Sequence, residues 1–255
     1  MLSFPFATSQ KEKLAIINEL KERLLIAHPT NILAIGVYGS MGLKNDLPYS
    51  DIELHVITTD EVVINSHEFI YDKFKIEVSV KQKQTFFKQA IKVDDSWAIK
   101  AGIFINILPI YDPQNIFAEV RKRPLQVSDA AIRETMKEFM IWEPYETIAK
   151  IRNNFIAQNY SYIPLGAKDL TWQTAKMIGL ANRKYYSTRA RTFEESLAMD
   201  SKPNGYVALA KSVMSGDLSD IEYIYQLCES LWIGLNEWYE KLGIKYRVHE
   251  LPSFE

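Results

Sequence analysis

The sequence is poor in the residues that mark secreted, fibrous and disordered chains. It has one cysteine, Cys228, in 255 residues, which excludes an internal disulfide, a CxxC metal site and a cysteine-ligated cluster. A reducing, cytoplasmic location is expected. Glycine and proline number only 10 each, so collagen-like and low-complexity classes are excluded. With 47% hydrophobic and 24% charged residues, the chain should fold as one large or two modest globular domains.

Net charge and long apolar runs are also scarce. The 30 basic and 32 acidic side chains leave a charge of −2, so nothing global attracts the chain to nucleic acid or anionic lipid, and neither partner is expected. The longest uncharged stretch, residues 24–43, contains His28-Pro29-Thr30-Asn31 and three glycines, which would break a membrane-spanning helix. The opening residues MLSFPFATSQKEK also lack the pattern of a signal peptide.

The first half of the chain mixes helix and strand patterns. Ser9 and Glu12 have the spacing of a capping box, which predicts a helix that runs to His28-Pro29. Residues 39–50 are rich in turn formers, and Pro109 places the last predicted strand at a sheet edge. The predicted strands are 32–38, 51–57, 69–71, 74–80 and 105–111, and the predicted short helices are 85–92 and 95–104.

The second half has only helical periods. Helices are predicted over 129–158, 168–186, 191–199, 205–214 and 219–242, with Gly243 as the last stop signal. The pattern changes at 121–126, a basic segment that contains Pro124. We therefore expect an α+β protein, with a mixed-sheet domain over 1–124 and an all-α helical bundle over 125–255.

Three carboxylates accompany a glycine-serine turn in the first half. Asp51 and Glu53 lie at i and i+2 of one strand, so their side chains share a face and could share a hard cation such as Mg²⁺. Glu77 lies on the polar face of a later strand, and Gly39-Ser40 could approach a phosphate. Each feature alone is more typical of an ordinary turn or a wet strand, and neither the Walker pattern nor G-x-G-x-x-G is present. Their order favours nucleotide chemistry.

That order resembles the nucleotidyltransferase superfamily of DNA polymerase β, whose signature is Gly-Ser, about ten residues, then Asp-x-Asp/Glu. Longer segments are similar to the kanamycin nucleotidyltransferases, the aminoglycoside 4′-O-nucleotidyltransferase family, and the likeness spans nearly the whole chain. The segments are AIGVYGS (34–40), PYSDIE (48–53), KIEV (75–78), ILPIYD (107–112) and VMSGDLSD (213–220).

The resemblance implies transfer of a nucleoside monophosphate from Mg-ATP, or another triphosphate, to the 4′-hydroxyl of a kanamycin-type antibiotic. Pyrophosphate would be released and resistance conferred. It also implies a homodimer with shared sites and two Mg²⁺ ions. The implied roles are metal binding for Asp51 and Glu53, phosphate contact for Gly39, Ser40, Lys44 and Ser50, a third carboxylate for Glu77, drug contact for Glu68, Glu77 and Glu143, base for Glu146 of the partner subunit, and α-phosphate contact for Lys150.

Glu143, Glu146 and Lys150 lie at i, i+3 and i+7 of a predicted helix, so they share one face. Without the resemblance, an exposed stripe closed by an i,i+4 ion pair is the better interpretation. Pro144 should kink this helix, and Trp142 stands where the family has another acid.

Other residues depart from the family pattern or lie outside it. Leu43, followed by Lys44, stands where the family has an arginine, and a lysine cannot form the bidentate fork. The four histidines lack metal-ligand spacing and are interpreted as structural or surface residues, with His55 on the same side of its strand as Glu53. Trp232 and Trp238 have the spacing of core or dimer packing.

Two alternatives stay open at this point. One is an enzyme of the same superfamily that modifies a lincosamide, another sugar or a protein. The other is a non-catalytic nucleotide-binding or antitoxin-like module.

Overall fold

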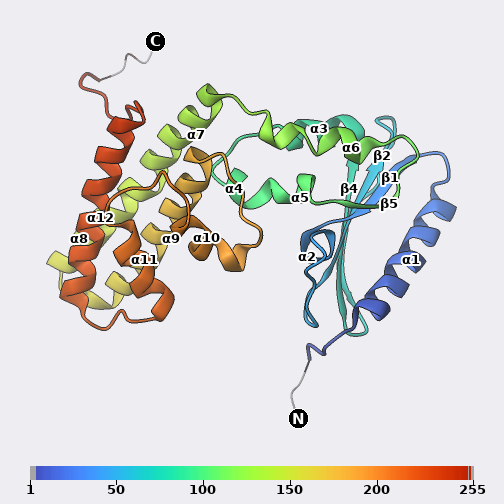
Figure 1. Ribbon diagram of the computed structural model, residues 1–255, viewed down its shortest axis with the longest axis horizontal. Helices are drawn as coiled ribbons and strands as arrows, with labels where there is room; N and C mark the ends of the chain where they lie inside the picture. The colour runs from blue at the N-terminus through green and yellow to red at the C-terminus, as the bar shows by residue number, and fades with distance from the viewer. Residues whose placement is uncertain (1–3, 252, 254–255) are drawn as a thin grey trace. The chain divides into compact units, whose positions relative to one another are not determined.

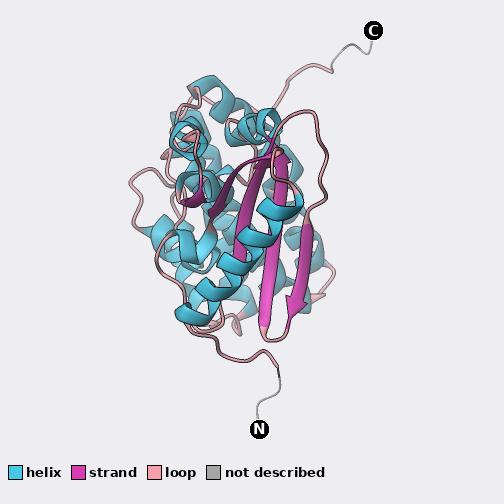
Figure 2. Cartoon of the chain, turned by 90° about the vertical axis from the view of Figure 1, so that its right-hand side faces the viewer, coloured by secondary structure: helices cyan, strands magenta, loops and turns pink. Residues whose placement is uncertain are grey.

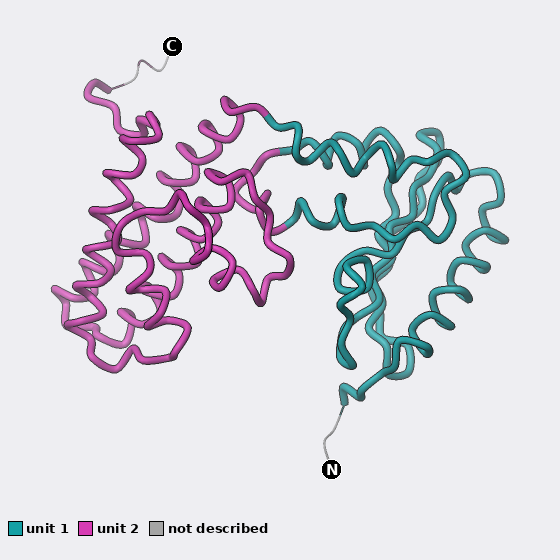
Figure 3. Tube along the Cα trace, viewed as in Figure 1, with its two compact units in different colours: residues 1–92, 100–127 teal, residues 93–99, 128–255 magenta. Residues whose placement is uncertain are grey.

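The computed structural model describes residues 4–251 and residue 253. These residues divide into two compact units, shown in different colours in Figure 3. Unit 1 comprises residues 1–92 and 100–127, and unit 2 comprises residues 93–99 and 128–255. The short segment 93–99 therefore packs with the helical unit, although it lies within the first half of the chain.

The described part of unit 1 is built on a five-stranded sheet with the order β3-β4-β2-β1-β5. The β2–β4 pair is parallel and the others are antiparallel, so the mixed sheet of the predicted α+β fold is confirmed. Strand β5 lies at an edge, as Pro109 predicted. The strands are β1 (Ile32–Val37), β2 (Ile52–Thr58), β3 (His67–Tyr71), β4 (Phe74–Gln82) and β5 (Leu108–Tyr111).

Helices cover both faces of this sheet. Helix α1 (Gln10–Ala27) lies across one face (Figure 2), where Ile17 joins a core with Leu54 of β2 and Ile76 of β4. The opposite face carries a second core that contains Phe86 and Phe117. The helices there are α3 (Lys83–Ala90), α5 (Gly102–Ile105) and α6 (Ile116–Val120), and the 3₁₀ helix η1 (Arg123–Leu125) follows α6.

Local sequence signals account for several element ends. Ser9 and Glu12 form the predicted capping box, in which the Ser9 side chain accepts from the Glu12 N–H. Asp112 accepts from the N–H groups of Ile116 and Phe117 at 2.8 and 3.0 Å, so it caps the start of α6. Asp72, at the turn between β3 and β4, adopts the left-handed conformation with a φ of 50°.

Four expectations for the first half of the chain are corrected. Residues 39–42 form a short helix, α2 (Gly39–Gly42), at the start of the expected turn. The helix expected over 85–92 begins two residues earlier, at Lys83. The helix expected over 95–104 is two short helices, α4 (Trp97–Lys100) and α5, which starts afresh after Ala101 at Gly102, a poor helix former. The strand expected over 105–111 begins only at Leu108, since α5 runs to Ile105.

Unit 2 is a helical bundle (Figure 1) in which α9 is central, because it contacts each of the other five α-helices that follow residue 128. Ala167, Leu170 and Ile178 of α9 are fully buried. Trp232 and Trp238 of α12 are also buried, so their predicted core role is confirmed. The helices are α7 (Asp129–Trp142), α8 (Pro144–Ile156), α9 (Ile163–Ala181), α10 (Thr192–Leu197), α11 (Tyr206–Ser215) and α12 (Ile221–Lys241), with η2 (Tyr160–Tyr162) and η3 (Arg189–Arg191) between them.

The single helix expected over 129–158 is wrong. Helix α7 ends at Trp142, Glu143 leaves the helical conformation with φ −120° and ψ −69°, and Pro144 opens α8. Proline lacks an N–H and suits the first turn of a helix, so Pro144 starts a new helix instead of kinking one. Helix α9 likewise starts earlier than predicted, with Pro164 in its first turn.

No helix in the described ranges has both the length and the apolar composition needed to cross a bilayer. The longest uncharged stretch, residues 24–43, is divided between the end of α1, strand β1 and helix α2.

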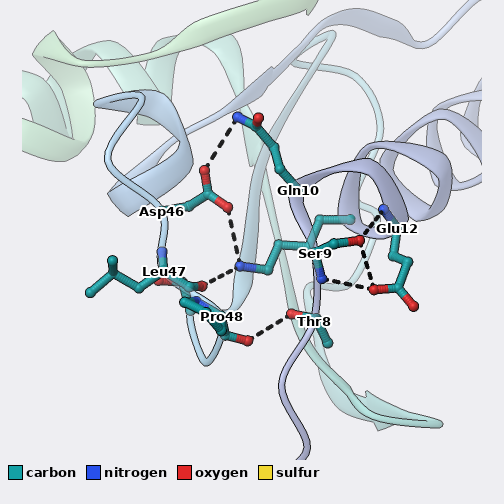
Figure 4. A network of polar contacts seen from close by, with 9 residues as sticks. Thr8, Ser9, Gln10, Glu12, Asp46, Leu47 and Pro48 are labelled. Atoms are coloured by element: carbon teal, nitrogen blue, oxygen red, sulfur yellow. Dashed lines mark hydrogen bonds and ion pairs between the residues drawn. The ribbon is translucent and has the colours of Figure 1, made fainter.

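A buried lysine ties the loop after α2 to helix α1. Figure 4 shows the loop residues Asp46, Leu47 and Pro48 in this network of polar contacts. Lys13 is fully buried, and its Nζ donates to Asp46 Oδ2 at 3.2 Å and to the Leu47 carbonyl at 2.7 Å. The backbone N–H and the hydroxyl of Thr8 both donate to the Pro48 carbonyl, at 2.8 and 2.9 Å. Residues 46–48 are thus fixed between Ser40 and Asp51, two residues of the predicted nucleotide site.

Replacing Lys13 by Met is expected to lower the free energy of unfolding by about 3–5 kcal/mol, because the Asp46 carboxylate, only 8% exposed, would lose its ion-pair partner and keep just the hydrogen bond from Gln10 Nε2 at 3.3 Å. Chemical denaturation measures the change. Lys11→Met removes an exposed lysine from the same helix and should change stability little. Adding Asp46→Asn to Lys13→Met should recover part of the loss, and no recovery would show that the stranded charge is not its cause.

Candidate active site

The glycine-serine turn brings the end of β1 against the start of β2. The Tyr38 N–H donates to the Glu53 carbonyl at 3.0 Å, and Gly39 follows with a φ of 62°. A Cβ atom on Gly39 would lie 1.6 Å from Glu53 Oε2, so both the backbone conformation and the space require glycine. The turn therefore places the Gly39 backbone directly against a carboxylate of the candidate site.

The three predicted carboxylates lie on neighbouring strands. Glu53 of β2 and Glu77 of β4 are directly paired in the parallel register, and Asp51 immediately precedes β2. Burial, and then the negative charges of Asp51 and Glu77, raise the pKa of Glu53 to about 7. The trio thus carries more negative charge than its surroundings neutralise, which is the electrostatic condition for attracting a cation.

A lysine that the sequence interpretation did not include contacts this trio. Lys75 Nζ lies 3.3 Å from Asp51 Oδ2 and 2.9 Å from Glu68 Oε1, and these contacts raise its pKa, with the Glu68 bond as the largest cause. Lys75 is about half exposed. The sequence feature that could have identified Lys75 as a site residue is its position on the polar face of β4, two residues before Glu77.

The phosphate-contacting residues predicted in unit 1 lie in the turn and the loop that follows it. Ser40 Oγ is buried and has no hydrogen-bond partner among the described residues, which leaves an unused donor in the residue after Gly39. Ser50 Oγ accepts from the Leu47 N–H at 3.0 Å, so its proton is available to a ligand. Lys44 follows Leu43, the C-cap of α2, and has a φ of 56°.

The oxygen donors of the site suit a hard cation that takes most of its ligands from the substrate and from water. Asp51, Glu53 and Glu77 offer only carboxylate oxygens, and within residues 4–251 and 253 no three acidic, histidine or cysteine side chains converge closely enough to hold a metal by themselves. Mg²⁺ is typically bound by one or two carboxylates together with substrate phosphates and water. The residues present therefore fit Mg²⁺ bound together with a triphosphate.

Glu53→Gln is expected to stabilise the metal-free protein at alkaline pH. The pKa of Glu53 is raised in the fold, so the folded state binds the Glu53 proton more tightly than the unfolded state does. The resulting contribution to the free energy of unfolding is complete below about pH 4.5 and is lost as the pH rises through about 7. The glutamine side chain stays neutral, and the variant should exceed the wild type by about 3 kcal/mol at pH 8. Denaturation with a chelator present, at pH 8 and pH 4.5, measures this difference, which should vanish at the lower pH. Equal stability at pH 8 would contradict it.

An aromatic stack lies behind the carboxylates. The Tyr38 ring stacks on His55 with centroids 3.9 Å apart and an interplanar angle of 12°. The Tyr38 hydroxyl donates to Glu77 Oε1 at 2.8 Å. His55 is 3% exposed, and burial lowers its pKa to about 3, so it is a neutral core residue. The structural interpretation of His55 is confirmed, and the surface alternative is wrong for this residue.

The remaining predicted residues belong to unit 2. Glu146 and Lys150 of α8 form an i,i+4 ion pair with 3.0 Å between Oε2 and Nζ, and both side chains are about half exposed. Contact with Glu146 raises the pKa of Lys150. Glu143, at the junction of α7 and α8, accepts from Gln173 Nε2 at 2.9 Å. Gln173 is buried on α9, and nothing in the sequence pattern marked it.

Comparison with known proteins defines the class first. A solved nucleotidyltransferase-like protein from Exiguobacterium sibiricum 255-15 matches the fold with a TM-score of 0.52 over 90% of this chain and 75% of that chain, at 14% sequence identity. A family model described as the KNTase C-terminal domain matches residues 114–245, just over half of the chain. The fold is thus that of nucleotidyltransferase-like proteins.

Two relatives then give the particular family. Both are named aminoglycoside nucleotidyltransferase (4′), one from Staphylococcus aureus and one from a Bacillus species, and each is 32% identical to this chain over 239 residues, which is 94% of both proteins. The chain belongs to the aminoglycoside nucleotidyltransferase (4′) family.

Proposed function

We propose that this protein transfers a nucleoside monophosphate from ATP or another nucleoside triphosphate to the 4′-hydroxyl of a kanamycin-type aminoglycoside, releases pyrophosphate and so confers resistance. The observation that carries this proposal is the 32% identity to aminoglycoside nucleotidyltransferases (4′) over 94% of both chains. The carboxylates beside the Gly39-Ser40 turn supply the matching chemistry, because a triphosphate needs a cation-binding site next to a phosphate-binding turn.

In this proposal Asp51 and Glu53 would hold Mg²⁺, and Glu77 would be the third carboxylate of the site. When bound, Mg²⁺ neutralises the triphosphate and aligns its α-phosphorus for in-line attack. Ser40, Ser50 and Lys44 would bind phosphate oxygens. The unpartnered Ser40 hydroxyl supports this assignment, since a buried hydroxyl without a partner is costly unless a ligand satisfies it.

The transfer step forms a bond between the 4′-oxygen and the α-phosphorus and breaks the bond between that phosphorus and the pyrophosphate oxygen. The hydroxyl proton would pass to Glu146 of the partner subunit, and Lys150 would bind an α-phosphate oxygen. Glu68, Glu77 and Glu143 would pair with ammonium groups of the drug. Glu68 is paired with Lys75 at 2.9 Å, so an ammonium group of the drug would replace or share this contact.

We also propose the domain limits and the assembly. Residues 1–124 would form the catalytic domain and residues 125–255 the helical domain, and the two compact units, which change at residue 128, support this division. A homodimer with shared sites follows from the family resemblance. A light-scattering mass twice that of the 29.5 kDa chain would support it, and a monomer mass would exclude it.

The proposed activity is tested by incubating the protein with Mg²⁺, ATP labelled at the α-phosphate, and kanamycin, tobramycin or lincomycin in separate reactions. Label should move to kanamycin and tobramycin, with the 4′ position identified by NMR of the product. Transfer to lincomycin alone would favour another enzyme of the superfamily, and transfer to none would contradict the proposal.

A further inference from the structure

The Tyr38 hydroxyl bonds to a carboxylate that lies on a strand not adjacent to its own. Tyr38 follows β1, whereas Glu77 lies on β4, and β2 separates these two strands in the sheet. Tyr38 reaches across β2 to donate to Glu77 Oε1 at 2.8 Å. Its own N–H is bonded to the Glu53 carbonyl at 3.0 Å, so this one residue is tied to two of the three carboxylate-bearing positions.

The Tyr38 ring is held in place by its neighbours. It is 4% exposed and lies flat on His55, whose Nε2 lies 3.2 Å from the Ile103 carbonyl. His55 in turn packs edge-on against Phe86 at 4.9 Å. A phenol ring confined on one side by an anchored imidazole has little freedom to turn away, so the direction of its O–H bond is set by the core.

Glu77 has less support of its own than Tyr38. Its side chain is only partly buried, and it belongs to a strand whose alternate residues form the sheet core. Glutamate has three side-chain torsions, so an unanchored carboxylate would sample several positions around the candidate site. A hydrogen bond to a charged oxygen from a fixed donor selects one of them.

We propose that Tyr38 is a positioning residue, whose hydroxyl holds the Glu77 carboxylate in place for binding the metal–triphosphate and for nucleotidyl transfer. This inference rests on the proposed function, which supplies the reaction that Glu77 takes part in. The contact itself predicts that Tyr38 acts through Glu77 and through no other group.

The test is a double-mutant cycle with Tyr38→Phe, Glu77→Ala and the double variant. Phenylalanine keeps the ring and its stack on His55, and alanine removes both oxygens that could accept from the tyrosine. Two quantities are measured for all four proteins: kcat and KM for transfer from Mg-ATP to kanamycin, and, by calorimetry, the affinity for Mg²⁺ with a non-hydrolysable ATP analogue. Tyr239→Phe is the matched control, since it also removes one buried hydroxyl, which donates to the Met136 carbonyl in unit 2.

Tyr38→Phe is expected to lower kcat and the affinity for the metal–analogue pair, with kcat roughly 10- to 100-fold lower, as for loss of a hydrogen bond to a charged group. The double variant should be no worse than Glu77→Ala, because the hydroxyl has nothing left to position. Tyr239→Phe should leave kcat and analogue affinity unchanged.

Two results would overturn the inference: wild-type kinetics and affinity in Tyr38→Phe, or a double variant that is worse than Glu77→Ala by the full Tyr38→Phe factor. A wild-type protein that binds the analogue but transfers nothing would contradict the proposed function alone, and the affinity cycle would still decide about Tyr38. A wild-type protein that binds no metal–analogue pair would contradict both.

Discussion

Asp51→Asn should reduce nucleotidyl transfer by roughly a thousandfold or more, because a neutral amide replaces a carboxylate that interacts with the cation and, through it, with the triphosphate. Asparagine has nearly the same shape as aspartate, and Asp51 immediately precedes β2 with its side chain 34% exposed, so the fold should persist. The substitution weakens the ion pair with Lys75 at 3.3 Å, which is partly exposed to solvent. The measurement is kcat/KM for Mg-ATP, with circular dichroism and thermal unfolding to establish that the variant is folded.

Asp72→Asn is the matched control for this prediction. Asp72 is an exposed residue of the same unit, in the β3–β4 turn, and asparagine tolerates its left-handed conformation. It should retain wild-type activity. A folded Asp51→Asn protein with nearly full activity would contradict the metal role, and intact nucleotide binding in both variants without any transfer would favour the non-catalytic alternative.

Glu146→Gln should lower kcat by roughly 100- to 10,000-fold, the usual range for loss of a general base, with a much smaller change in KM for Mg-ATP. Two interpretations of Glu146 are open, one from the structure and one from the family resemblance. It is half of an exposed i,i+4 pair with Lys150, which by itself indicates a solvated helix face. The family resemblance instead gives Glu146 the proton of the sugar hydroxyl. Steady-state kinetics distinguish the two interpretations.

A second exposed pair provides a close control for Glu146. Glu19 and Arg23 on α1 are also spaced i,i+4, and Glu19 is 50% exposed, compared with 52% for Glu146. Glu19→Gln should leave kcat unchanged. If Glu146→Gln matches Glu19→Gln in every kinetic constant, Glu146 is a surface residue and the proton must pass to another group.

The sequence allowed the main features of unit 1 to be predicted because short-range patterns determine them. The capping box at Ser9 and Glu12, the alternation along β4 and the proline of the edge strand each act within a few residues. Asp51 and Glu53 could be paired for the same reason, since two positions along a strand always share a face. The family resemblance then supplied the chemistry that these local patterns leave open.

Contacts that depend on strand register could not be predicted. The bond between Tyr38 and Glu77 joins residues that are 39 positions apart, and the stack on His55 requires the β1–β2 pairing to place the two rings together. The ion pair of buried Lys13 with Asp46 is similarly distant in sequence, and a lysine in a helix is usually expected at the surface. No pattern within a few residues of these positions indicates the contacts.

Pro144 shows a different difficulty. The apolar periodicity continues on both sides of it, so the pattern indicates one helix with a kink, whereas the structure contains two helices that meet at Glu143. A proline is compatible with either arrangement, because it disrupts a helix interior but suits a first turn. The local pattern therefore does not distinguish the two arrangements.

A crystal structure with Mg²⁺, a non-hydrolysable nucleoside triphosphate and kanamycin tests the central claim most directly. We expect Mg²⁺ bound to oxygens of Asp51 and Glu53, the phosphates at the Gly39-Ser40 turn, and the 4′-hydroxyl of the drug facing the α-phosphorus. A triphosphate bound away from these carboxylates, with Asp51 still paired to Lys75, would contradict the proposed site and its chemistry.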